Sequence, residues 1–94
     1  MAFRQMNATV GTTASKVFIL PPGTGYTAVQ FSNTHTSAMF LGASSSVSAS
    51  GANHGLLLAA NSNSQVWMRG GDEIWAIASV ASGTGDLAIL YSGV

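Results

Sequence analysis

The chain has 94 residues, of which 47% are hydrophobic and only 6% are Asp, Glu, Lys or Arg, and its formal net charge is zero. This length fits one compact domain, and the composition excludes a highly charged, disordered segment. Three basic residues are too few for the positive surface that nucleic-acid binding needs, and the lack of cysteine excludes disulfides, thiolate metal sites and cysteine nucleophiles.

Residues 1–7 precede the first predicted strand, so we expect them to form a flexible N-terminal arm, followed by a single β-sandwich domain over residues 8–94. Arg4 is not followed by the apolar run of a secretory signal, and no later run approaches the roughly 18 apolar residues of a transmembrane helix. We therefore expect neither an export signal nor a membrane partner.

Short stretches rich in β-branched and aromatic residues then follow one another, separated by clusters of Gly, Pro, Asn and Ser. Such spacing is typical of β-strands, and no window has the apolar period of a helix. Strands are predicted at residues 8–10, 17–20, 26–31, 39–41, 55–58, 66–68, 74–78 and 87–91. The fold is therefore predicted to be all-β, a small antiparallel β-sandwich or jelly-roll-like barrel of about seven or eight strands. The Ser-rich segment 43–52 is expected to form an exposed strand and loop.

Alternation along the strands indicates which side chains face the core. Two stretches, 17–20 and 74–78, are apolar on both faces, which fits either central strands beneath loops or a second face packed on another subunit. A chain with one lysine has little protection for its strand edges, which favours the second interpretation. The expected core residues are Val29, Phe31, Leu41, Ile74, Ala76 and Leu90.

No group of residues points to catalysis or to a bound cofactor. The two histidines, His35 and His54, lie in predicted turns without a nucleophile elbow or metal-ligand spacing around them. Two Gly-x-Gly patterns, at 23–28 and 83–88, match a relaxed dinucleotide fingerprint, but each precedes a β-type stretch where a phosphate loop needs a helix. We expect no enzyme activity, catalytic residue, cofactor or metal.

Several segments from residue 26 onward follow a pattern of paired strands and turns: VQFSNT (29–34), AMFLG (38–42), SSSVS (44–48), RGGDEIWAIA (69–78) and GTGDLAIL (83–90). Their order resembles small virion proteins of tailed bacteriophages, in which a V-x-N-T-S…V-Y-L-G…S-V hairpin precedes a G-D-x-L-Y-A-I-A…G-T-x-D-V-x-V-L hairpin. This chain has Trp75 where a Tyr is common. The resemblance implies a structural virion protein without enzymatic residues: a capsid decoration (cement) protein, a head-fibre base or a minor tail or neck component.

We expect a decoration protein that binds the major capsid protein on the outside of the shell, stabilises the assembled virion, and forms a homo-oligomer, with a trimer favoured. Because the chain has few charges, its contacts should be apolar or hydrogen-bonded. The expected contact residues lie in the arm and in two loops, which no predicted strand needs: Phe3, Arg4, Met6, Asn33, His35, Asn53 and His54.

A carbohydrate-binding module is the alternative from another class of protein. Tyr26, Trp67, Trp75 and Tyr91 offer ring faces on which a sugar can stack. Burial of Trp67 and Trp75 would assign them to the core, whereas a flat exposed platform would favour sugar binding. An enzyme would be favoured only if a histidine met an acid in a cleft.

Overall fold

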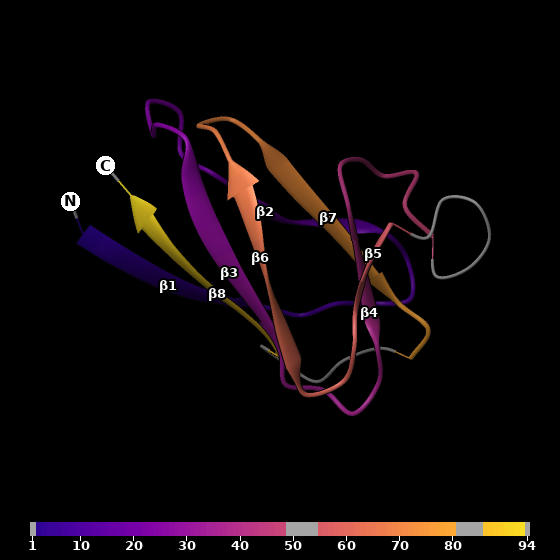
Figure 1. The fold of residues 1–94 in the computed structure, drawn as a ribbon. Coiled ribbons are helices and arrows are strands. Elements are labelled where there is room, and N and C mark those ends of the chain that lie inside the picture. Colours follow the sequence, from indigo (N-terminus) through magenta and orange to yellow (C-terminus); the bar gives the residue numbers. More distant parts are fainter. Residues whose placement is uncertain (1, 49–54, 81–85, 94) are drawn as a thin grey trace.

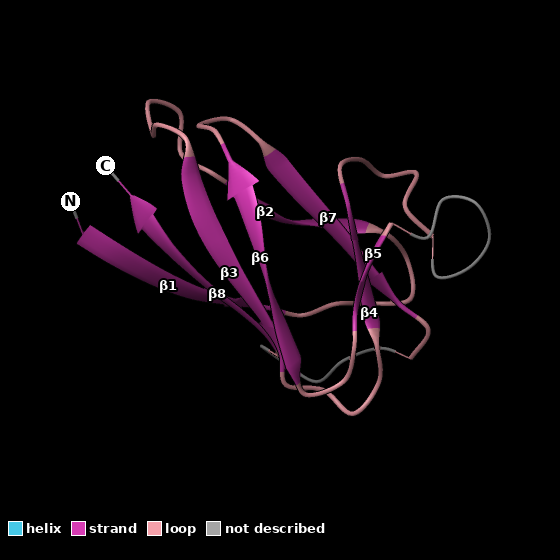
Figure 2. Cartoon of the chain, viewed as in Figure 1, coloured by secondary structure: helices cyan, strands magenta, loops and turns pink. Residues whose placement is uncertain are grey.

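The computed structural model describes residues 2–48, 55–80 and 86–93, and these form eight strands and no helix (Figures 1 and 2). A strand lies at each predicted range from 17–20 onward. The strands are β1 (Ala2–Ala8), β2 (Ser15–Ile19), β3 (Thr27–Asn33), β4 (Met39–Gly42), β5 (Leu56–Leu58), β6 (Ser62–Met68), β7 (Glu73–Ala78) and β8 (Leu87–Gly93).

The strands form two four-stranded sheets in which every neighbouring pair is antiparallel. Sheet A has the order β1-β8-β3-β6, and sheet B has the order β2-β7-β4-β5. Each sheet thus combines strands from both ends of the chain, which is the strand order of an eight-stranded jelly roll. The predicted antiparallel sandwich is confirmed.

The core lies between the two sheets. The ring of Phe18, on β2, lies edge-on to two rings of sheet A. The distance between ring centroids is 6.1 Å to Phe31 and 4.9 Å to Tyr91. Such aromatic contacts join sheet B to sheet A beyond simple burial of apolar area. The buried cluster consists of Val10, Val17, Phe18, Leu20, Val29, Phe31, Met39, Leu41, Leu58, Met68, Ile74, Ala76, Ala78, Leu87 and Ile89.

The prediction of the core is confirmed for Val29, Phe31, Leu41, Ile74 and Ala76, which are all buried, and wrong for one residue. Leu90 is 46% exposed on the outer face of sheet A. Its neighbours Leu87 and Ile89 point inward instead, because the pairing of β8 with β3 places Ile89 opposite Phe31.

The N-terminal residues form a strand where the sequence predicted a flexible arm. β1 pairs with β8 along its whole length, from Ala2 opposite Gly93 to Ala8 opposite Leu87. The strand β8 is the physical reason, because β3 pairs with only one of its edges and the backbone groups of the other edge are available to bond to residues 2–8. The first strand therefore spans Ala2–Ala8 and does not start near residue 8.

The described part of the Ser-rich segment, residues 43–48, contains no strand, contrary to the prediction. It turns back over β4, and the amide of Val47 donates to the carbonyl of Ser44 at 3.2 Å. Val47 is buried against Gly42, where a Cβ atom would approach Val47 to 2.6 Å. Glycine at position 42 therefore makes room for this turn. Residues 49–52 lie outside the described part of the chain.

Candidate functional site

Three of the predicted contact residues lie on β1, and we call them the β1 edge: Phe3, Arg4 and Met6. Phe3 is 81% exposed, and Arg4 and Met6 are exposed as well. Met6 lies opposite the core residue Ile89, so it points to the inner face of sheet A, and its exposure shows that sheet B leaves this part of β1 uncovered, whereas Ala8 packs against the core. The β1 edge therefore presents apolar side chains on both faces of one strand, at one end of the sandwich (Figure 1).

Asn33 is not a contact residue, because its side chain is completely buried. Its Nδ2 donates to the carbonyls of Ser37 at 2.9 Å, Leu58 at 3.1 Å and Ala59 at 3.3 Å. Its Oδ1 accepts a hydrogen bond from the amide of His35 at 2.8 Å. The polar side chain therefore joins the ends of β3 and β5, and the prediction of a partner-binding role is wrong.

His35 lies beside an acid. Its Nδ1 is 3.2 Å from Asp86 Oδ2, and both side chains are largely buried. Thr34 binds the same residue, because its amide and its hydroxyl both donate to the backbone carbonyl of Asp86. This pair fixes the loop after β3 to the start of β8. Neither of the two surface depressions described on the molecule is lined by His35 or Asp86.

The other predicted loop contacts, Asn53 and His54, lie outside the described residues. Among the residues that are described, no three His, Asp or Glu side chains are grouped so that they could hold a metal ion. None of them forms a helix of the length and apolarity needed to cross a membrane.

A second exposed apolar edge lies on β5, which the loop prediction overlooked. We call Leu56 and Leu57 the β5 edge; they are 46% and 54% exposed, and β5 is the outermost strand of sheet B. The opposite edge of that sheet, β2, is protected differently: Lys16 pairs with Glu73 at 3.5 Å, and the strand has a bulge between Lys16 and Phe18. Charge and bulges discourage pairing with other chains, and β5 has neither.

An apolar row crosses the outer face of sheet B and ends at the β5 edge. The register places Ile77 opposite Phe40 and Phe40 opposite Leu57. The alternation of residues 74–78 predicted this second apolar face. Trp75 lies on the same face, half-buried, and its indole nitrogen donates to Glu73 Oε1 at 3.1 Å. Sheet B therefore carries an apolar outer surface that continues into an unprotected edge.

The two tryptophans do not form one platform, because Trp75 is on sheet B and Trp67 is on the outer face of sheet A. Trp67 is 56% exposed and stacks on Tyr26, which is 63% exposed, at 5.2 Å between ring centroids and 25° between planes. The exposed aromatic pair is therefore Tyr26 with Trp67. Alternation in β6 puts Trp67 on the same face as exposed Gln65, a signal that was available in the sequence.

Comparison of the chain with protein-family models, with curated proteins and with solved structures gave no match.

Proposed function

We propose that this protein is a structural component of a virion, a capsid decoration protein that binds the outside of the major capsid shell and stabilises it. The observation that carries the proposal is the pair of exposed apolar edges on a protein with only six charged residues. Monomeric β-proteins usually place charged residues, proline or bulges at such edges. β5 has none of these, and β1 has one charged residue, Arg4, between the exposed Phe3 and Met6. A chain that exposes apolar edges is suited to permanent contact with other protein surfaces.

The two edges lie at opposite ends of the sandwich (Figure 1). β1 is the edge strand of sheet A at one end of the sandwich. At the other end, β6 is the edge strand of sheet A and β5 is the edge strand of sheet B. A contact between the β1 edge of one copy and the β5 edge of the next would be head-to-tail, and contacts of this kind close into rings when the rotation between copies allows it. We therefore propose a homotrimer, in which each copy uses both edges.

A protein that binds the assembled shell but not its separated subunits stabilises the assembled state by mass action. Many copies on a repetitive lattice make modest apolar contacts effective, because each additional contact within one assembly is intramolecular. The apolar row of sheet B supplies the contact with the major capsid protein. The jelly roll occurs in viral capsid proteins, which supports the proposal by analogy of architecture alone.

The oligomeric state and the location are tested separately. Sedimentation of the purified protein should give a trimer, and Phe3→Ser or Leu57→Ser should shift it toward the monomer. Val80→Ser is the matched control, because Val80 is an exposed apolar residue outside both edges. A monomeric wild type would contradict the ring.

Immunogold labelling of virions made from a genome that encodes this chain should decorate the heads. The label should persist in 1 M NaCl, because six charged residues supply little electrostatic attraction to be screened. Unlabelled particles or label confined to tails would contradict the capsid role.

A further inference from the structure

The outer face of sheet A is covered by uncharged amide and hydroxyl side chains. One row across the sheet runs through Gln5, Leu90, Gln30 and Gln65, and a second through Asn7, Ala88, Ser32 and Asn63. Residues opposite each other on paired strands point to the same side of a sheet. We call the polar members the amide face: Gln5, Asn7, Gln30, Ser32, Asn63 and Gln65.

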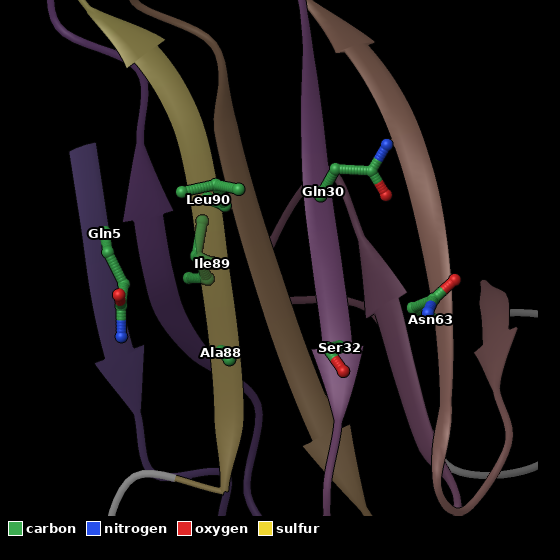
Figure 3. A pocket seen from close by; sticks show the side chains of 7 residues that line it. All are labelled: Gln5, Gln30, Ser32, Asn63, Ala88, Ile89 and Leu90. Carbon is green, nitrogen blue, oxygen red and sulfur yellow. The ribbon is translucent and has the colours of Figure 1, made fainter. Parts of the chain in front are cut away.

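The amide face holds a shallow depression of about 230 Å³ that is open to solvent. Figure 3 shows Gln5, Leu90 and Gln30 extending from three strands around it, with the short side chains of Ala88 and Ser32 leaving room between them. The exposed lining of the depression is mainly apolar, with Ala88, Ile89 and Leu90 contributing to it, and the polar groups of Gln5, Gln30, Ser32 and Asn63 stand around it. The depression can therefore hold a small ligand that has both apolar and hydrogen-bonding parts.

The amides are held in place by one another. Gln30 Nε2 donates to Gln65 Oε1 at 2.8 Å, and Gln5 Nε2 to Asn7 Oδ1 at 3.4 Å. An amide has two donor hydrogens and an acceptor oxygen. The bond between Gln30 and Gln65 uses only one group of each, so both side chains keep donors or acceptors for a ligand in an already fixed orientation.

The stacked pair of Tyr26 and Trp67 borders the amide face. Trp67 follows Gln65 by two positions on β6, which places the two residues about 7 Å apart on the same face of the strand. The Arg69 guanidinium lies 5.6 Å from the centre of the Tyr26 ring. An aromatic surface thus stands next to fixed amides, within the length of one or two sugar units.

We propose that the amide face and the pair of Tyr26 and Trp67 bind a neutral glycan. The C–H face of a sugar ring stacks on an aromatic ring, and paired amide groups bond to neighbouring hydroxyls. The two rows contain no Asp, Glu, Lys or Arg, and the single cation beside the rings, Arg69, already lies over the Tyr26 ring, which fits an uncharged ligand. A single-stranded nucleic acid would require a basic groove beside the rings, and a protein partner would require a larger apolar centre.

Most of this site lies away from the proposed virion contacts, because it is on the sheet opposite the apolar row. β1 contributes Gln5 and Asn7 to the amide face and also forms the proposed contact between copies, whereas Gln30, Gln65 and the ring pair lie on or beside β3 and β6. Binding of glycans can therefore be measured on the isolated protein, and its failure would leave the capsid proposal standing.

Affinity electrophoresis provides the test. The wild type should be retarded in gels that contain dextran, galactomannan or hydroxyethyl cellulose, and not in gels that contain the anionic polysaccharide hyaluronan. Trp67→Ala and Tyr26→Ala should each weaken binding by about tenfold, since a ring contact contributes on the order of one such factor. Both rings are more than half exposed, so these variants should fold, and their circular dichroism and melting midpoint verify this.

Trp75→Phe is the matched control, because this aromatic residue lies on sheet B and should leave glycan binding unchanged. Three outcomes would overturn the proposal: no retardation by any of the three neutral polysaccharides, retardation by hyaluronan alone, or unchanged binding by folded Trp67→Ala and Tyr26→Ala.

Discussion

Replacing Asn33 with alanine should destabilise the protein by roughly 3 kcal/mol. The two Nδ2 hydrogens serve the carbonyls of Ser37, Leu58 and Ala59, so they account for two full hydrogen bonds, and Oδ1 accepts a third from His35. Each bond contributes about 1 kcal/mol net, and a buried group left without a partner costs about 1–3 kcal/mol. Water can reach some of the released groups, which keeps the total near the sum of three ordinary bonds.

Urea denaturation followed by circular dichroism measures this loss, because the midpoint and slope give the free energy of unfolding. Asn33→Asp should be at least as destabilising, since its carboxylate has no hydrogens to donate to the three carbonyls. Asn63→Ala is the matched control: Asn63 is exposed on β6, and its loss should cost under about 0.5 kcal/mol.

A loss below about 1 kcal/mol for Asn33→Ala would refute this reasoning. Asn33 would then hold no essential contact between the ends of β3 and β5. Its side chain would have to be considered again as part of a loop that contacts a partner. Against a typical total stability of about 5–15 kcal/mol, the expected loss of roughly 3 kcal/mol is easily measured.

Two further pairs of variants test the core and a turn by the same denaturation assay. Phe31→Ala should lower the free energy of unfolding by about 3–5 kcal/mol, because its ring is fully buried. Leu90→Ala should lower it by under about 1 kcal/mol, because Leu90 is exposed. Equal losses would mean that the inward face of sheet A is misassigned. Gly70→Ala should cost about 1–3 kcal/mol, since a Cβ atom there would lie 2.7 Å from the carbonyl oxygen of Thr24. Gly25→Ala is its control and should be nearly neutral, because no atom lies near the added Cβ. A neutral Gly70→Ala would contradict the close approach.

The sequence predicted the strands well, and it predicted the facing of side chains most clearly where polar residues mark one face. In β3, Gln30 and Ser32 alternate with Val29 and Phe31, so the buried face could be identified. In β8, residues 87–91 are all apolar, and alternation gives no choice between Leu90 and its neighbours. The register with β3, which exists only in the folded sheet, determines which residues of β8 face the core.

Contacts between residues distant in sequence were harder to predict. The buried side chain of Asn33 donates to the carbonyl of Ala59, 26 positions away, and the sequence around position 33 gives no sign of that partner. Tyr26 and Trp67 were recognised as possible stacking residues, but 41 positions separate them. β1 has no apolar alternation, because both of its faces are exposed at the end of the sheet.

The central place of β8 in sheet A determines the order in which this protein can fold. β8 lies between β1 and β3, so β1 has no strand to pair with until residues 87–93 have left the ribosome. The first strand made must wait for the last one of the sheet, and closing so long a loop is slow compared with forming a local hairpin. Until then the apolar residues of the nascent chain have no complete core, which makes this interval the period of greatest risk of aggregation.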